Sequence, residues 1–188
     1  MKLCIIGGGS HSNVVIDTAL LLGYNKFLIF DDKKIIFEKK TNKIYAGKIS
    51  KFLKYHNMDY FIAIGENSSR KNIFKLLYSN NNKLVTLIHP ISYVSNSSKI
   101  GKGSILLPNT VVNANSVIKK CCIVNTSSTI DHDCVISNFS HIAPGVNIAG
   151  NVSVGSEAFI GIGSKIVNNI VLKSKSFITA GTIVKKNL

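Results

Sequence analysis

The chain has 188 residues, enough to bury one sizeable core or two modest ones, and a formal net charge of +14. No apolar stretch is long enough to span a membrane, and Lys2 is followed by only a short apolar run into Gly7. We therefore expect no membrane partner, no signal peptide and a cytoplasmic location. The lysines are scattered and accompany no nucleic-acid-binding motif, so we expect no nucleic-acid partner; a basic surface equally favours polyanionic small molecules.

The four cysteines do not have the spacing of a metal site. No two of them form a CxxC pair; they are Cys4, Cys121, Cys122 and Cys134. We expect them to be buried structural thiols, because free cysteine behaves as a small apolar residue.

The first thirty residues predict a strand, a glycine turn and a helix. Residues 2–7 form an apolar run that ends in Gly7-Gly8-Gly9-Ser10-His11-Ser12, and residues 13–22 are expected to be helical. Glycines let backbone N–H groups approach an anion at a helix N-terminus, so this turn suits a phosphate. A second strand, 26–30, leads into Asp31-Asp32, which is either a ligand-binding acidic pair or a solvated turn.

Further strands and helices complete an α/β unit. A short helix is expected near 50–56, a buried strand at 60–65 ending in Gly65, and a helix capped by Asn67 or Ser68. A fourth strand is expected at 83–88. This β-α-β order predicts a parallel sheet with helices on its faces and ligands at the carboxyl ends of the strands.

The second half of the chain repeats every six residues. Every sixth residue is aliphatic: these markers are Val94, Ile100, Leu106, Val112, Ile118, Val124, Ile130, Ile136, Ile142, Ile148, Val154, Ile160, Ile166, Leu172, Ile178 and Val184. The residue four positions after each marker up to Ile178 is small, except at Val146, Val152 and Ile170. Neither an α-helix nor a free strand has this period, whereas a parallel β-helix of hexapeptide rungs does. About five coils of three hexapeptides are expected.

One turn of this β-helix has the composition of a catalytic site. His132 lies between Asp131 and Asp133, and a carboxylate beside a histidine makes the imidazole a stronger general base. A metal site is disfavoured, because adjacent residues point to opposite sides and cannot easily ligate one ion. A polar turn without catalytic function is another alternative, and nucleophilic catalysis by Cys134 is a weaker one, because the register places that thiol in the corner.

The whole chain resembles the bacterial sugar acetyltransferases typified by PglD and NeuD, in which a small nucleotide-sugar domain precedes a left-handed β-helix. The segments that carry the resemblance are Gly7-Gly8-Gly9-Ser10-His11, Asp31-Asp32, Phe61-Ile62-Ala63-Ile64-Gly65, Asn125-Thr126, His132-Asp133-Cys134, Ser140-His141 and Ala149-Gly150-Asn151-Val152. The resemblance implies a Rossmann-like sugar-nucleotide-binding domain over 1–89 and a left-handed parallel β-helix over 90–188. Ser12 and Ala180 depart from it, since both stand where relatives have glycine.

The resemblance also implies roles for individual residues. His132 would be the general base and Asp133 the acid that raises its basicity. The acetyl-CoA site, between adjacent subunits of a homotrimer, would be lined by His141, Gly150, Ile162 and Ala180. The nucleotide sugar would be bound by Gly9, Ser10, His11, Asp31, Asp32 and Gly65.

The expected function is acetyl-CoA-dependent N-acetylation of the 4-amino group of a nucleotide-linked amino-deoxyhexose, for surface glycan or glycoprotein biosynthesis. No metal is expected. Two alternatives stand beside it: an O-acetyltransferase acting on a sialic-acid-like sugar, and a non-catalytic β-helix that serves as a binding or assembly module.

Overall fold

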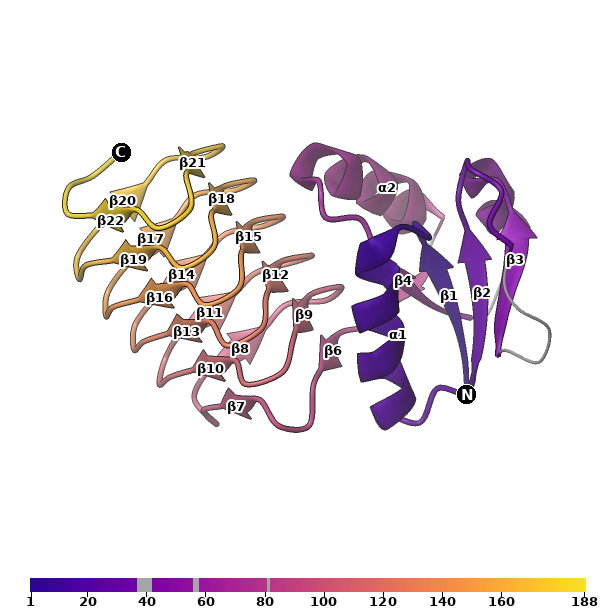
Figure 1. Ribbon diagram of the computed structural model, residues 1–188, viewed down its shortest axis with the longest axis horizontal. Helices are drawn as coiled ribbons and strands as arrows, with labels where there is room; N and C mark the ends of the chain where they lie inside the picture. The colour runs from indigo at the N-terminus through magenta and orange to yellow at the C-terminus, as the bar shows by residue number, and fades with distance from the viewer. Residues whose placement is uncertain (37–41, 56–57, 81) are drawn as a thin grey trace. The chain divides into compact units, whose positions relative to one another are not determined.

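The chain divides into two units, Met1–Leu87 and Ile88–Leu188 (Figure 1). The computed structural model describes residues 1–36, 42–55, 58–80 and 82–188. None of the helices in these ranges is long and apolar enough to cross a membrane.

Over its described residues, the first unit is a parallel sheet with helices, as the β-α-β pattern predicts, but it has five strands instead of four because residues 43–47, which the sequence did not predict as a strand, pair at its edge. The strand order is β3-β2-β1-β4-β5, with α1, the short 3₁₀ helix η1 and α2 in the connections (Figure 1). The elements are β1 Lys2–Ile6, α1 Ser10–Leu21, β2 Lys26–Phe30, β3 Lys43–Gly47, η1 Ile49–Lys54, β4 Asp59–Ile62, α2 Asn67–Ser79 and β5 Lys83–Leu84. The chain leaves β1 toward β2 on one side and returns to β4 on the other. The carboxyl ends of β1, β2 and β4 therefore meet where ligands bind in such sheets.

Both helix starts differ from the expectation. Helix α1 begins at Ser10 rather than at residue 13, because Gly9 takes the N-cap position and its carbonyl accepts the N–H of Ser12 at 2.9 Å. Helix α2 is capped by Glu66 and not by Asn67 or Ser68. The carboxylate of Glu66 accepts the backbone N–H groups of Ser68 and Ser69 at 2.9 and 2.6 Å, and an anion is also favoured at the positive end of the helix dipole.

The second unit is a parallel β-helix with three sheets of six, six and five strands (Figure 1). Each strand pairs with the strand one coil away, so that Val112 lies opposite Ile130 and Ile130 opposite Ile148. The first sheet contains β6 Leu87–Ile88, β9 Ile105–Leu106, β12 Ile123–Val124, β15 His141–Ile142, β18 Phe159–Ile160 and β21 Phe177–Ile178. The second contains β7 Tyr93–Val94, β10 Val111–Val112, β13 Thr129–Ile130, β16 Asn147–Ile148, β19 Lys165–Ile166 and β22 Ile183–Val184. The third contains β8 Lys99–Ile100, β11 Val117–Ile118, β14 Val135–Ile136, β17 Ser153–Val154 and β20 Val171–Leu172.

The hexapeptide markers form the core of this unit, as predicted. Every marker is the second residue of its strand, and those from Leu106 onward are 4% exposed or less. The small residues four positions later are buried in the corners from Ser104 to Ser164. Their hydroxyls can satisfy the backbone there: Ser104 Oγ, for example, donates to the Lys119 carbonyl one coil away at 2.7 Å.

The predicted fourth strand at 83–88 is wrong as a single element. Lys83–Leu84 pairs with β4 in the first sheet, whereas Leu87–Ile88 pairs with β9 as the first rung of the β-helix. The apolar run continues through the junction because both parts are strands with an inward face. Ile88 is thus one more marker of the six-residue series, ahead of Val94.

Candidate active site

His132 lies in the turn between β13 and β14, at a corner of the β-helix. The residue three positions after many markers has a positive φ, and in this turn it is Asp133, with φ 58°. Asp and Asn tolerate this left-handed conformation better than most side chains. The turn places Asp133 Oδ2 2.8 Å from His132 Nδ1, and both side chains remain about half exposed, at 51% and 57%. The predicted pair therefore forms, with Nε2 as the ring nitrogen that can accept a proton.

The neighbouring coils hold this turn in place. Asp133 N–H donates to the Ala114 carbonyl of the preceding coil, and the His132 carbonyl accepts the N–H of Asn151 from the following coil, both at 2.9 Å. Buried Ser116 bridges the turn: its Oγ donates to the Asp131 carbonyl and accepts the Cys134 N–H. The backbone around His132 is thus fixed on both sides.

Two asparagines from the preceding coil orient the carboxylates. Asn115 Nδ2 donates to Asp133 Oδ1 at 3.1 Å, and Asn113 Nδ2 donates to Asp131 Oδ1 at 3.0 Å. Asp131 Oδ1 also accepts the backbone N–H of His132 at 2.8 Å. Sequence reasoning missed both asparagines. The signal that could have found them is their separation of 18 residues, one coil, from the two aspartates.

The carboxylates make the imidazole more basic. The hydrogen bond to Asp133, followed by the negative charge of Asp131, raises the pKa of His132. Hydrogen bonds from His132 and Asn115 lower the pKa of Asp133, and those from Asn113 and the His132 backbone lower that of Asp131. Both aspartates therefore stay ionised at neutral pH beside an imidazole with increased proton affinity, which suits a general base.

Gly150, predicted in the acetyl-CoA site, lies against the His132 ring. A Cβ at Gly150 would be 2.6 Å from both Cε1 and Nε2 of His132, a distance that requires the ring to move. Gly150 is 18 residues after His132 and belongs to the equivalent turn of the next coil. The absence of a side chain there lets the imidazole pack on the backbone in its present orientation.

We expect Gly150→Ala to lower kcat by about 10- to 100-fold, because small displacements of a reacting group have effects of that size. The added methyl group would push Nε2 away from its position, while the backbone conformation suits alanine as well. Asn168→Ala, one coil further on, is the matched control and should retain full kcat in the same steady-state assay. A Gly150→Ala protein with unchanged kcat would contradict the conclusion that the position of the His132 ring over Gly150 matters for the reaction.

The other predicted acetyl-CoA residues lie elsewhere in the β-helix. His141, Ile162 and Ala180 line a hollow of about 440 Å³ on the first sheet and the adjoining corner, and His132 and Gly150 do not belong to it. Its walls are largely apolar and aromatic: His141 packs edge-on against Phe159 at 5.2 Å between ring centroids, and Phe159 stacks on Phe177 at 5.3 Å. Within one chain, His132 and this hollow are on different corners.

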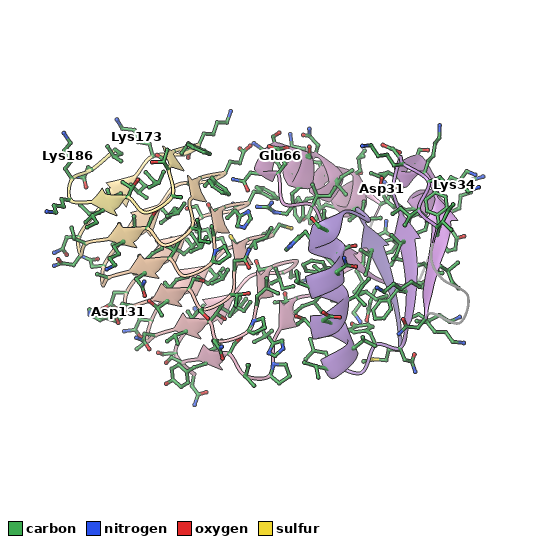
Figure 2. All side chains as sticks on the ribbon, viewed as in Figure 1. Asp31, Lys34, Glu66, Asp131, Lys173 and Lys186 are labelled. Atoms are coloured by element: carbon green, nitrogen blue, oxygen red, sulfur yellow. The ribbon has the colours of Figure 1, made fainter. Side chains whose placement is uncertain are left out.

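The first unit brings most of the predicted nucleotide-sugar residues into one pocket. A pocket of about 430 Å³ is lined by Gly7, Gly9, Ser10, His11, Asp31, Ala63, Ile64, Gly65 and Glu66 (Asp31 and Glu66 are labelled in Figure 2). Asp32 does not line it. Its Oδ1 accepts the Ile49 N–H at 3.2 Å, which makes it part of a turn.

Asp31 is fixed at the mouth of the glycine turn. Its Oδ2 accepts the Gly8 N–H at 2.7 Å and its Oδ1 accepts the Lys33 N–H at 2.8 Å. Gly7, with φ +97°, passes so close to β4 that a Cβ would be 2.9 Å from the Ala63 carbonyl oxygen. These contacts hold the ends of β1, β2 and β4 around the pocket.

His11 contributes a neutral ring to this pocket. Burial, and then the positive charge of Arg70, lowers its pKa to about 4. Its Nε2 atom is buried and has no hydrogen-bond partner among residues 1–36, 42–55, 58–80 and 82–188, which suits a ligand-binding group. Sequence reasoning missed two residues of this region, Glu66 and Arg70. Hydrogen bonds from Ser69 and Ser68 lower the pKa of Glu66 to about 2.

The geometry offers no metal centre in the described ranges. No group of three or more His, Cys, Asp or Glu side chains there is arranged to hold an ion. At the His132 turn, the two carboxylates are engaged with asparagine amides and with His132 itself.

Comparison with known proteins agrees with this architecture. Residues 2–77 match the PglD N-terminal domain. The acetyltransferase domain of PglB from Neisseria gonorrhoeae FA1090, solved with acetyl coenzyme A, is 34% identical, with a TM-score of 0.93, over 100% of this chain and 92% of that one. A mutant of GDP-perosamine N-acetyltransferase from Caulobacter crescentus, solved with CoA and GDP-perosamine, is 28% identical, with a TM-score of 0.91, over 100% and 90% of the two chains.

A curated relative matches over a shorter stretch. The UDP-N-acetylbacillosamine N-acetyltransferase of Bacillus subtilis strain 168 is 29% identical over 56% of this chain and 51% of its own length, so the chain spans about half of that relative. The similarity to the Neisseria domain, by contrast, extends through both units. By its N-terminal domain and this full-length similarity, the chain belongs to the family of PglD-type sugar acetyltransferases.

Proposed function

We propose that this protein is an acetyl-CoA-dependent N-acetyltransferase acting on the 4-amino group of a nucleotide-linked amino-deoxyhexose. The observation that carries the proposal is the His132–Asp133 pair at 2.8 Å, half exposed on a β-helix that is similar over its full length to solved acetyltransferases. The relatives' names, which include two amino-sugar N-acetyltransferases, support an amine acceptor.

In this reaction the amine attacks the thioester carbon directly. The new N–C bond forms as the C–S bond breaks, His132 Nε2 accepts the proton lost by the amine, and the thiolate of coenzyme A leaves. Asp133 holds Nδ1–H and stabilises the imidazolium that forms. A backbone N–H near the reacting carbonyl would stabilise the oxyanion.

Cys134 does not suit an acyl-enzyme intermediate. Its side chain is fully buried, its Sγ lies 3.2 Å from the Ala149 carbonyl, and burial raises the pKa of the thiol. A nucleophilic cysteine needs an accessible thiolate. This supports direct transfer.

The separation of His132 from the hollow around His141 supports a site built from two subunits. We propose a homotrimer in which the His132 corner of one chain faces the hollow of its neighbour. Light scattering should then give a trimeric mass. His132→Ala and Ala180→Trp, each inactive alone, should regain activity when co-expressed, because one site in the mixed trimer would keep both halves. A monomer with full activity, or no complementation, would contradict the shared site.

The nucleotide pocket can be tested by a matched pair of aspartates. Asp31→Ala should raise KM for the sugar nucleotide about tenfold and leave KM for acetyl-CoA unchanged, because the lost interaction concerns only that substrate. Asp32→Ala is the control, since Asp32 does not line the pocket. Equal effects of Asp31→Ala on both substrates would mean that the first unit supports the fold or assembly only.

The reaction itself is tested with purified protein, acetyl-CoA and a panel of amino-sugar nucleotides. Release of coenzyme A together with an amide-containing sugar nucleotide supports the proposal. An acetyl ester on a sialic-acid-like sugar would establish the O-acetyltransferase alternative. No turnover with any acceptor, together with tight assembly, would favour a binding or assembly module.

A further inference from the structure

The chain has a single arginine, and its position differs from that of the lysines. Lys34, Lys173 and Lys186 extend from the surface (Figure 2), whereas the Arg70 side chain is 1% exposed. A buried charge needs fixed hydrogen-bond partners, and a guanidinium binds several acceptors at once in a planar arrangement that an ammonium group cannot reproduce. The environment of Arg70 therefore requires the planar arrangement of guanidinium donors as well as a positive charge.

Three hydrogen-bond acceptors of Arg70 lie in the loop between β4 and α2 and at the first residue of α2. Nη1 donates to the carbonyls of Ile64 and Gly65 at 3.0 and 2.8 Å, and Nη2 donates to Asn67 Oδ1 at 2.7 Å. Arg70 itself lies in the first turn of α2. Its guanidinium thus ties the start of the helix to the end of the strand before it.

This loop is a wall of the nucleotide pocket. Ile64, Gly65 and Glu66 line the pocket together with the glycine turn and Asp31. In a trans peptide the carbonyl of one residue and the N–H of the next point in opposite directions. By fixing the carbonyls of Ile64 and Gly65, Arg70 therefore also fixes the N–H directions of Gly65 and Glu66.

The charge of Arg70 reaches the same pocket. It is the second cause, after burial, of the low pKa of His11, which lines the pocket from the first turn of α1. The N-terminus of α1 adds partial positive charge on that side. Both features oppose the negative charge of Asp31 and Glu66, which also line the pocket, and favour an anionic group such as a diphosphate.

We propose that Arg70 is a positioning residue of the nucleotide pocket: its Nη1 holds the carbonyls of Ile64 and Gly65, its Nη2 holds Asn67 at the start of α2, and its positive charge is fixed behind the Ile64–Glu66 wall for the diphosphate of a nucleotide sugar. Because the side chain is almost fully buried, it acts through the wall and not by contact with the ligand. This assignment rests on the proposed function.

The test measures binding of UDP, GDP and dTDP to the full chain by calorimetry, with KM values for both substrates. Arg70→Lys keeps the positive charge and removes the two guanidinium donor groups, Nη1 and Nη2. The Kd for the nucleotide that wild type binds should therefore rise about tenfold or more. KM for acetyl-CoA should stay unchanged, a split that general loss of structure would not give. Lys75→Gln, an exposed residue of the same helix, is the control and should bind like wild type.

Asn67→Ala provides a second variant if Arg70→Lys fails to fold. It leaves the guanidinium in place and removes one of its acceptors, so Kd should rise by about threefold or more. If a folded Arg70→Lys protein binds the nucleotide as tightly as wild type, the proposed role of Arg70 is overturned while the proposed function stands. If Arg70→Lys is unfolded, wild-type affinity in Asn67→Ala has the same meaning. If wild type binds none of the three nucleotides, the proposed function fails and this assignment fails with it.

Discussion

His132→Ala should lower kcat by about 10²–10⁴-fold, the usual effect of removing a general base. The amine would then have to lose its proton to water while it attacks the thioester. KM for acetyl-CoA should change little, because His132 does not line the apolar hollow around His141 and its replacement leaves the walls of that hollow unchanged. Steady-state kinetics with saturating amino-sugar nucleotide measures both quantities.

Ser156→Ala is the matched control for this variant. Ser156 occupies the same position in the turn after β17 that His132 occupies in the turn after β13, two residues past the marker. It should retain wild-type kcat. Near-full turnover by His132→Ala would instead make His132 a polar turn residue, and the base would have to be sought elsewhere.

Asp133→Asn should have the second-largest effect, a fall in kcat of about 10- to 10³-fold, because the ring loses its orienting carboxylate. Asparagine suits the left-handed φ of 58° at this position, so the turn should keep its conformation. The variant therefore separates the charge of residue 133 from the fold of the turn.

The pH profile gives the direction that identifies the partner. The hydrogen bond to Asp133 is the largest cause of the raised pKa of His132, so its loss lowers that pKa. The base then stays unprotonated to lower pH, and the acidic limb of the kcat/KM profile should move to lower pH. Asp131→Asn should move the limb the same way but less, because Asp131 acts on the ring by its charge alone. An unmoved limb, or one that moves upward, would remove Asp133 from the mechanism.

Much of the fold could be predicted because its determinants are local. The six-residue period specifies strands with one inward aliphatic residue each. Every marker from Val94 to Val184 is the second residue of its strand, and those from Leu106 onward are buried. The predicted strand at 83–88 was wrong because one continuous apolar run is divided between two different sheets. The apolar run 83–88 is continuous in sequence, yet it splits between the sheet and the β-helix, because pairing partners and not composition decide where a strand belongs.

The sequence by itself determined the repeat, the two types of unit, and the pairing of His132 with Asp133, because adjacent residues in a tight turn need no distant contact to meet. Only the tertiary structure decided what surrounds them. Gly150 meets the His132 ring because successive coils stack in register, and Arg70 is buried because its partners converge at the end of β4. The same applies to Asp31 and Asp32, which sequence treats alike and the fold separates into a pocket residue and a turn residue. Such contacts depend on how strands and coils pack. The periodicity of the sequence does not determine which residues distant along the chain come into contact.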